Sequence, residues 1–222
     1  VYFYTHCSAT LCMHTQEPLS SRCNKGMSCA RGAATAAWMG SCVCLVALQG
    51  PSEVLERTMY ATSLPPTLVS TMVPLAALAA AMLPFGLSSG FLQWPTLNKG
   101  AARLLGLGIT TLVAPGILEE AIFRVALLSI PVAPAEAMLA WLAFVVYHLD
   151  TIHPPLHSDP RFLATAGALG MACTVAYYTS GGSMWAAVLV HWFPVWAWLG
   201  LLGGLEAHER GHFGSRAQDT SA

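Results

Sequence analysis

The chain has 222 residues, of which 55% are apolar and only 9% are charged, and its formal net charge is −1. Soluble domains carry roughly 25% charged residues, so this composition excludes an ordinary water-soluble domain. It predicts an all-α fold, a polytopic bundle of transmembrane helices with the lipid bilayer as its partner. The near-zero net charge and the lack of a basic patch in the sequence exclude nucleic acid as a partner.

Residues 1–32 form a polar leader rich in Ser, Thr and Cys, which contains three basic residues and a single acid, Glu17. Such an acid-poor, Ser-rich bias is typical of organelle transit peptides, so we expect a transit-like or disordered segment. Six of the seven cysteines lie within the first 44 residues. Their spacing fits no zinc pattern, and we interpret them as unpaired thiols.

The remainder divides into apolar stretches and short polar connections. Residues 50–66 are predicted to be a loop, because three charged side chains precede the helix-stopping pair Pro65-Pro66. Five stretches are predicted to span the bilayer, and a sixth candidate lies near the N-terminus. The five clear spans are 67–87, 101–130, 135–149, 161–179 and 183–204, and the candidate is 33–49. We expect one intramembrane domain over 33–205, followed by a charged, disordered tail at 206–222.

The basic residues support this assignment independently of hydropathy. If the five spans alternate in direction, Arg57 lies alone on one side of the membrane. The other side holds Lys99, Arg103, Arg161, Arg210 and Arg216. The positive-inside rule predicts such an asymmetry, and it assigns the C-terminal tail to the cytoplasm- or stroma-like side.

Three charged residues lie within the apolar stretch 101–130, at Glu119, Glu120 and Arg124. Each costs roughly 2.5 to 3.5 kcal/mol at the centre of a bilayer even on lenient scales. Glu120 and Arg124 are four residues apart and can neutralise each other on one helix face. Glu119 is left without a partner in its own segment, which marks it as a candidate functional residue.

Two of the eight histidines, His148 and His191, lie within apolar spans. From a rise of 1.5 Å per residue, the depths of Glu119, His148 and His191 are roughly 16, 20 and 12 Å from the side poor in cations. We therefore expect the three side chains to meet in one pocket at mid-depth. Pro115 and Pro194 are expected to weaken the helices beside them.

These residues resemble a known family. Glu119-Glu120-Ala-Ile-Phe-Arg124 fits the motif E-E-x-x-x-R, Phe144-Val-Val-Tyr-His148 fits F-x-x-x-H, and His191 begins the third motif, H-x-x-x-N/D. Together they resemble the CPBP family, whose members are type II CAAX prenyl endopeptidases and bacteriocin-processing or Abi proteins. The third motif departs from the family pattern, because Val195 stands where Asn or Asp is expected. The stretch around it is similar to cyanobacterial and plastid-type members, which favours a plastid or bacterial-type membrane.

The resemblance implies hydrolysis of a peptide bond in a membrane-associated protein or peptide, with a prenylated substrate as one option. Glu119 and His148 would activate a water molecule, and His191 would donate a hydrogen bond to the oxyanion. Glu120, Arg124 and Phe144 would orient them. Glu119, His148 and His191 are also a plausible zinc set. We favour a reaction that requires no cofactor and keep zinc as the alternative.

Three other interpretations remain open. The polar residues could form a hydrogen-bonded network that only holds helices together. The chain could keep the family fold as a non-proteolytic binding or immunity protein, which the apolar Val195 favours. A proton-coupled transporter is the third, although no inverted repeat is visible in the sequence.

Overall fold

The computed structural model describes residues 50–94, 100–149 and 159–210, and in this part of the chain every regular element is a helix. The all-α prediction is confirmed. The expected leader at 1–32 and the sixth candidate span at 33–49 lie outside the described residues. Helix α4 (Leu68–Ser88), the segment Ala101–Ala126 and helix α9 (Pro160–Thr179) are long and apolar enough to cross a membrane. Helix α10 (Met184–Gly200) is apolar but shorter, and α7 covers Pro134–Leu149. The count of five spans stays a prediction.

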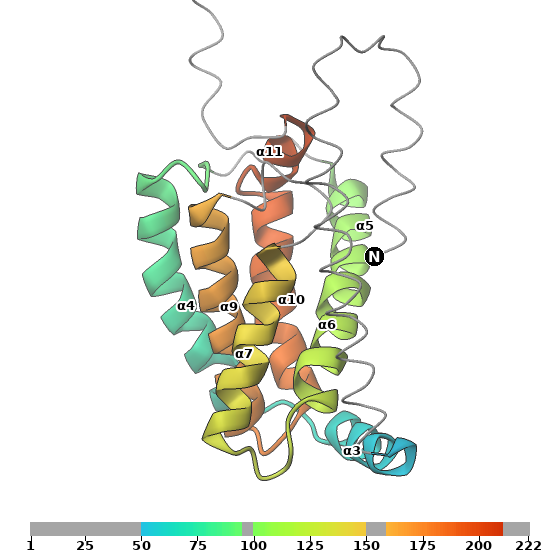
Figure 1. Ribbon diagram of the computed structural model, residues 1–222. Coiled ribbons are helices and arrows are strands. Elements are labelled where there is room, and N and C mark those ends of the chain that lie inside the picture. Colours follow the sequence, from blue (N-terminus) through green and yellow to red (C-terminus); the bar gives the residue numbers. More distant parts are fainter. Residues whose placement is uncertain (1–49, 95–99, 150–158, 211–222) are drawn as a thin grey trace, which may run out of the picture.

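The long helices alternate in direction. In Figure 1, α4, α7 and α10 run from the end of the bundle where α3 lies to the end where α11 lies, while the segment from α5 and then α9 run back. Hydrogen bonds tie the elements at each end. Arg161, at the start of α9, donates to the Ser89 carbonyl at 2.7 Å, and Ser183 donates to the Leu64 carbonyl at the opposite end, also at 2.7 Å.

The predicted loop at 50–66 is wrong over most of its length, because Pro51–Ser63 forms helix α3. Proline favours the first position of a helix, where its missing N–H costs nothing, and Pro51 occupies that position. Ala61 is fully buried, and Arg57 donates to the Leu128 carbonyl at 3.1 Å. The tail prediction is also wrong at its start, because Gly204–Arg210 forms helix α11.

The apolar stretch 101–130 is not one regular helix. Helix α5 (Ala101–Thr111) continues as a π-helical turn η2 (Leu112–Ile117), a short α6 (Leu118–Glu120) and a second π-helical turn η3 (Ala121–Ala126). Ala114 leaves the helical region, with φ −136° and ψ 113°. The residue before a proline is pushed toward extended conformations, so the expected weakening at Pro115 is confirmed. Helix α10, in contrast, continues through Pro194.

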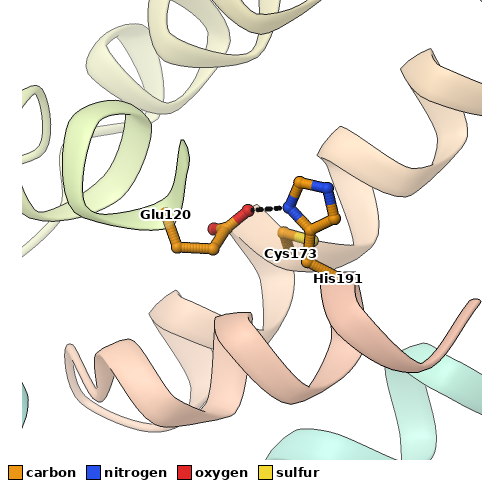
Figure 2. A group of neighbouring side chains, drawn as sticks. All are labelled: Glu120, Cys173 and His191. Carbon is orange, nitrogen blue, oxygen red and sulfur yellow. Dashed lines mark hydrogen bonds and ion pairs between the residues drawn. The ribbon is translucent and has the colours of Figure 1, made fainter. Parts of the chain in front are cut away.

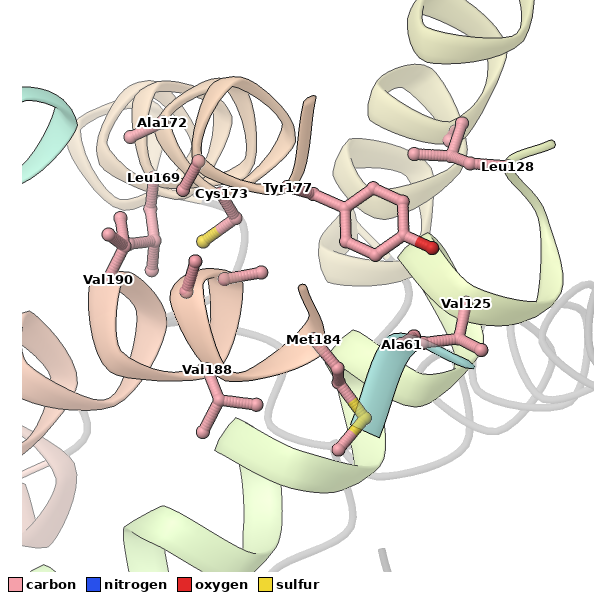
Figure 3. Packing of buried hydrophobic residues seen from close by; sticks show 14 of the residues in the cluster. Ala61, Val125, Leu128, Leu169, Ala172, Cys173, Tyr177, Met184, Val188 and Val190 are labelled. Carbon is pink, nitrogen blue, oxygen red and sulfur yellow. The ribbon is translucent and has the colours of Figure 1, made fainter. Parts of the chain in front are cut away.

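Helices α9 and α10 form the centre of the bundle. Small residues along α9 allow close approach, and Figure 3 shows Leu169 and Cys173 of α9 on the side that faces α10, with Val190 of α10 beside Leu169. Of the two glycines of α9 with a side chain close by, Gly170 has the tighter fit. A Cβ added there would lie 2.7 Å from the Phe144 ring of α7. This glycine therefore sets the distance between α9 and the helix that carries His148.

Candidate active site

Glu119 lies on α6, between the two π-helical turns, and its side chain is 14% exposed. Its Oε2 atom is buried and has no hydrogen-bond partner among the described residues. The same atom lies 3.9 Å from Nε2 of His148 and 3.9 Å from Nε2 of His191. π-helical turns are frequent at functional sites because they re-aim side chains. Here they surround the carboxylate that the two imidazoles face.

His148 lies in the last turn of α7, and its orientation is set by the backbone of its own helix. The Nδ1 atom lies 2.8 Å from the Phe144 carbonyl oxygen. A carbonyl can only accept a hydrogen bond, so Nδ1 carries a proton and donates it. In neutral His148 the Nε2 atom is therefore an acceptor, and it is the atom that faces Glu119.

His191 is held by Glu120, which comes from a segment 71 residues earlier in the chain. Figure 2 shows the Glu120 carboxylate and the His191 ring pointing toward each other, with Nδ1 2.6 Å from Oε1. The other Glu120 oxygen forms an ion pair with Arg124 at 3.2 Å. All three side chains are at most 1% exposed. Glu120 thus neutralises Arg124, as the i, i+4 spacing predicts, and also orients His191.

Phe144 packs between these charged groups. Its ring is fully buried, lies 4.4 Å from the His148 ring between centroids, and has the Arg124 guanidinium carbon 4.9 Å from its own centroid. An arginine over an aromatic face gains a cation–π attraction. Arg124 also donates to the Gly170 carbonyl at 2.7 Å. Phe144 therefore contacts both His148 and Arg124, as expected of a residue that orients them.

A cavity of about 380 Å³ opens beside these residues. Glu119, His148 and His191 line it, and Val195 lines it one turn after His191. Most of the remaining lining is apolar and comes from α4, α9 and α10. Active sites are commonly apolar pockets with a few convergent polar groups, and this cavity has that composition. The three residues predicted to meet at mid-depth thus lie together at its wall.

Two contributors to the site were missed by sequence reasoning, the Gly170 carbonyl and Cys173. Cys173 is buried on α9 and lies beside Glu120 and His191 in Figure 2. Ligand atoms of these three residues lie within 4.8 Å of one another. Glu120 is already engaged by Arg124 and by the His191 proton, so the group is better explained as packing around a hydrogen bond than as a metal site. No sequence pattern marks a lone cysteine or a backbone carbonyl for such a role.

Residues 101–197, which carry all three motifs, match the family described as type II CAAX prenyl endopeptidase Rce1-like. The resemblance to the CPBP family is confirmed. No curated protein and no solved structure gives a match. The Rce1-like family is a protease family, and described helices are long and apolar enough to cross a bilayer. Both observations support an integral membrane protein that is similar to CAAX proteases. Its assignment to the cyanobacterial and plastid branch stays a prediction.

Proposed function

We propose that the chain is an intramembrane endopeptidase in which Glu119 and His148 activate a water molecule. The observation that carries the proposal is the Glu119 Oε2 atom, which is buried without a hydrogen-bond partner and faces two imidazole nitrogens at 3.9 Å each. A buried acceptor without a partner costs about 1–3 kcal/mol. A water molecule held between Glu119 and His148 removes that cost and occupies the position of a nucleophile.

The reaction follows from the hydrogen-bonding state of each group. Glu119 and neutral His148 each accept a hydrogen bond from the water, so a water lone pair is free to attack the peptide carbonyl. The water proton passes to Glu119, and the new C–O bond produces a tetrahedral oxyanion. Glu119 then gives the proton to the amide nitrogen as the C–N bond breaks. The products are a carboxylic acid and an amine.

His191 serves the oxyanion when it carries a proton on both nitrogens. Its Nδ1–H donates to Glu120, which leaves Nε2–H to donate into the cavity. The charges then balance, because two carboxylates, Glu119 and Glu120, face two cations, Arg124 and His191. A balanced set avoids the large penalty of an unpaired charge in an apolar interior.

Zinc is the alternative cofactor, and the donor types of Glu119, His148 and His191 suit it. The Nδ1 contacts to a carbonyl and to a carboxylate also resemble the outer contacts of zinc-binding histidines. The spacing fits less well. Tetrahedral ligands at 2.0–2.1 Å from zinc are about 3.3 Å apart, whereas these atoms are 3.9 Å apart. A bridging water fits the wider spacing, which supports a reaction that needs no metal.

The substrate we propose is a membrane-associated protein or peptide, with a prenylated one as a specific option. The apolar walls of the cavity support this proposal, because an apolar side chain or an aliphatic group would be desolvated there. A plastid or bacterial-type membrane remains our proposal for the location, and the acid-poor leader at 1–32 supports the plastid.

The test compares peptide termini in membranes that contain the wild-type chain with those that contain Glu119→Gln. We expect a set of new termini that depends on Glu119, and purified protein without stoichiometric metal by elemental analysis. One equivalent of zinc, lost in single substitutions of Glu119, His148 and His191, would contradict the metal-free mechanism. It would leave the protease proposal standing. Identical termini in both membranes, with both proteins folded, would contradict the protease.

The second candidate function is a membrane protein that binds a peptide without cleaving it. Val195 favours it, because the residue one turn after His191 brings no polar atom to the cavity. In that case Glu119→Gln would weaken peptide binding and leave the pattern of termini unchanged. The same pair of membranes therefore separates the two functions.

A further inference from the structure

The proposed reaction leaves the cavity short of hydrogen-bond donors. Glu119 can only accept while it is ionised, and neutral His148 accepts at Nε2 because its proton is on Nδ1. His191 offers one donor when protonated. A tetrahedral oxyanion is stabilised by several convergent donors, and each is worth several kcal/mol in a site from which water is excluded. A second donor is therefore expected at the cavity wall.

Neither α10 nor α9 supplies this second hydrogen-bond donor near His191. Val195, which lines the cavity one helical turn after His191 on α10, is apolar. Thr165 of α9 also lines the cavity, but its hydroxyl donates to the Arg161 carbonyl at 2.8 Å. Trp198 and His208 stack near Phe91 and Phe162, toward the α11 end. The remaining hydroxyl of the lining belongs to Tyr147.

Tyr147 precedes His148 on α7 and lines the same cavity as Glu119. Its ring packs at right angles to the His148 ring, with 5.3 Å between centroids, and lies 5.4 Å from the Phe123 ring. Within the described ranges its hydroxyl makes no hydrogen bond to protein. The side chain is thus fixed by its ring while its donor is uncommitted.

We propose that Tyr147 is a further catalytic residue, whose hydroxyl donates a hydrogen bond to the oxyanion opposite the donor from His191. This inference rests on the proposed protease function. The phenol keeps its proton throughout, so it adds no charge to the balanced set of carboxylates and cations. It also supplies from α7 the donor that α10 lacks at Val195.

The experiment measures hydrolysis of a quenched peptide carrying a cleavage site mapped by the comparison of termini described above. Tyr147→Phe keeps both ring contacts and removes only the hydroxyl. We expect kcat to fall about 10²-fold, as for loss of one oxyanion donor, while KM and the amount of folded protein stay unchanged. Tyr177→Phe is the matched control, because the Tyr177 hydroxyl also has no hydrogen-bond partner among the residues that the structure describes but belongs to the packed core. Its kcat should not change.

Val195→Asn provides the rescue, because it introduces an amide donor on α10. We expect the increase in kcat to be at least about tenfold larger in the Tyr147→Phe background than in the wild type. Full activity of Tyr147→Phe, with Glu119→Gln inactive, would overturn this inference and leave the protease standing. An equal effect of Val195→Asn in both backgrounds would also overturn it. If Glu119→Gln itself retains full activity, the protease proposal fails and this inference fails with it.

Discussion

Glu119 and Glu120 are adjacent in the chain and occupy opposite environments. Glu120 is 0% exposed and has an arginine on one oxygen and a histidine on the other. Glu119 is 14% exposed, and its Oε2 has no hydrogen-bond partner in the described part of the chain. One step of a helix, about 100°, separates them. A paired carboxylate stabilises the fold, whereas one held open beside two imidazoles is available for chemistry.

The arrangement also divides the two histidines. His191 is 1% exposed and is tied to the paired carboxylate, while His148 is 13% exposed and its Nδ1 contacts the carbonyl of Phe144 in its own helix. Both direct Nε2 toward Glu119. The buried network of Glu120 and Arg124 therefore positions His191 on one side of the site, and α7 positions His148 on the other. Substitutions on the two sides should separate activity from stability.

The largest effect is expected for Glu119→Gln. The amide is nearly isosteric but cannot take a proton from water, so cleavage should fall by about 10⁴-fold, the upper range for loss of a general base. The thermal unfolding midpoint in detergent should stay within experimental error, because no hydrogen bond of Oε2 is lost. Glu53→Gln, on a carboxylate that is 62% exposed, is the control and should alter neither quantity. A large drop in the unfolding midpoint of Glu119→Gln would remove the contrast between the two acids.

Arg124→Ala should show the opposite pattern. It leaves Glu120 buried without its cation and removes the bond to the Gly170 carbonyl. Breaking a buried pair costs about 3–5 kcal/mol, so the yield of folded protein and its unfolding midpoint should both fall. Glu53→Ala is the comparison, because it removes an ion pair whose carboxylate is 62% exposed, and such pairs contribute about 1 kcal/mol or less. Equal losses in both variants would mean that burial of the pair does not matter.

The sequence allowed prediction of the helical class, the position of most helices and the convergence of Glu119, His148 and His191. These features depend on hydropathy, on the rise per residue and on the high cost of charge in lipid, all of which are local properties. The bond from Glu120 to His191 was not predictable, because it depends on how two helices are rotated about their own axes. The orientation of His148 likewise depends on its rotamer.

Helix α3 was missed for a different reason. Its charged residues indicated a loop, yet Arg57 reaches the Leu128 carbonyl and Ala61 is buried against the bundle. Tertiary contacts therefore stabilise a segment that hydropathy alone does not select. The helix break at Ala114 was predicted only in its position. Pro115 indicated the place, but the two π-helical turns that aim Glu119 have no signature in a single sequence.

A smaller effect is expected where the two sides of the site meet. An alanine at Gly170 would place its Cβ 2.7 Å from the Phe144 ring, so the ring or α9 must move. Overpacking of this kind costs about 1–3 kcal/mol, and a displaced Phe144 should also lower activity through His148. Gly106→Ala is the matched control, since a Cβ there has no neighbour within 4 Å. If Gly170→Ala leaves both stability and activity unchanged, the tight contact between α7 and α9 is not needed by the site.

The smallest effect concerns Asp159, which lies just outside the membrane-spanning part of α9. Its side chain caps the helix by accepting from the Arg161 N–H at 2.8 Å, and it pairs with the Arg161 guanidinium at 2.7 Å. The hydrogen bond from that guanidinium holds the pKa of Asp159 below its usual value. A lowered pKa in the folded state means that the pair stabilises the protein above the unfolded pKa of about 3.9. This stabilisation is lost as the pH falls through the folded pKa.

Asp159→Asn keeps an acceptor for the cap and removes the charge, whereas Asp159→Ala removes both. Loss of a cap costs about 1 kcal/mol, and a partly exposed ion pair at the end of a helix contributes about 1 kcal/mol or less, so Asp159→Ala, which loses both, should be the less stable variant at neutral pH. The wild type should exceed Asp159→Asn in unfolding midpoint at pH 7, and that difference should shrink steadily below about pH 4 as the carboxylate is protonated. Because only the difference between the two proteins is read, acid effects elsewhere cancel. A difference that stays constant from pH 7 to pH 3 would show that Asp159 acts through its cap alone, with no contribution from the charge of Arg161.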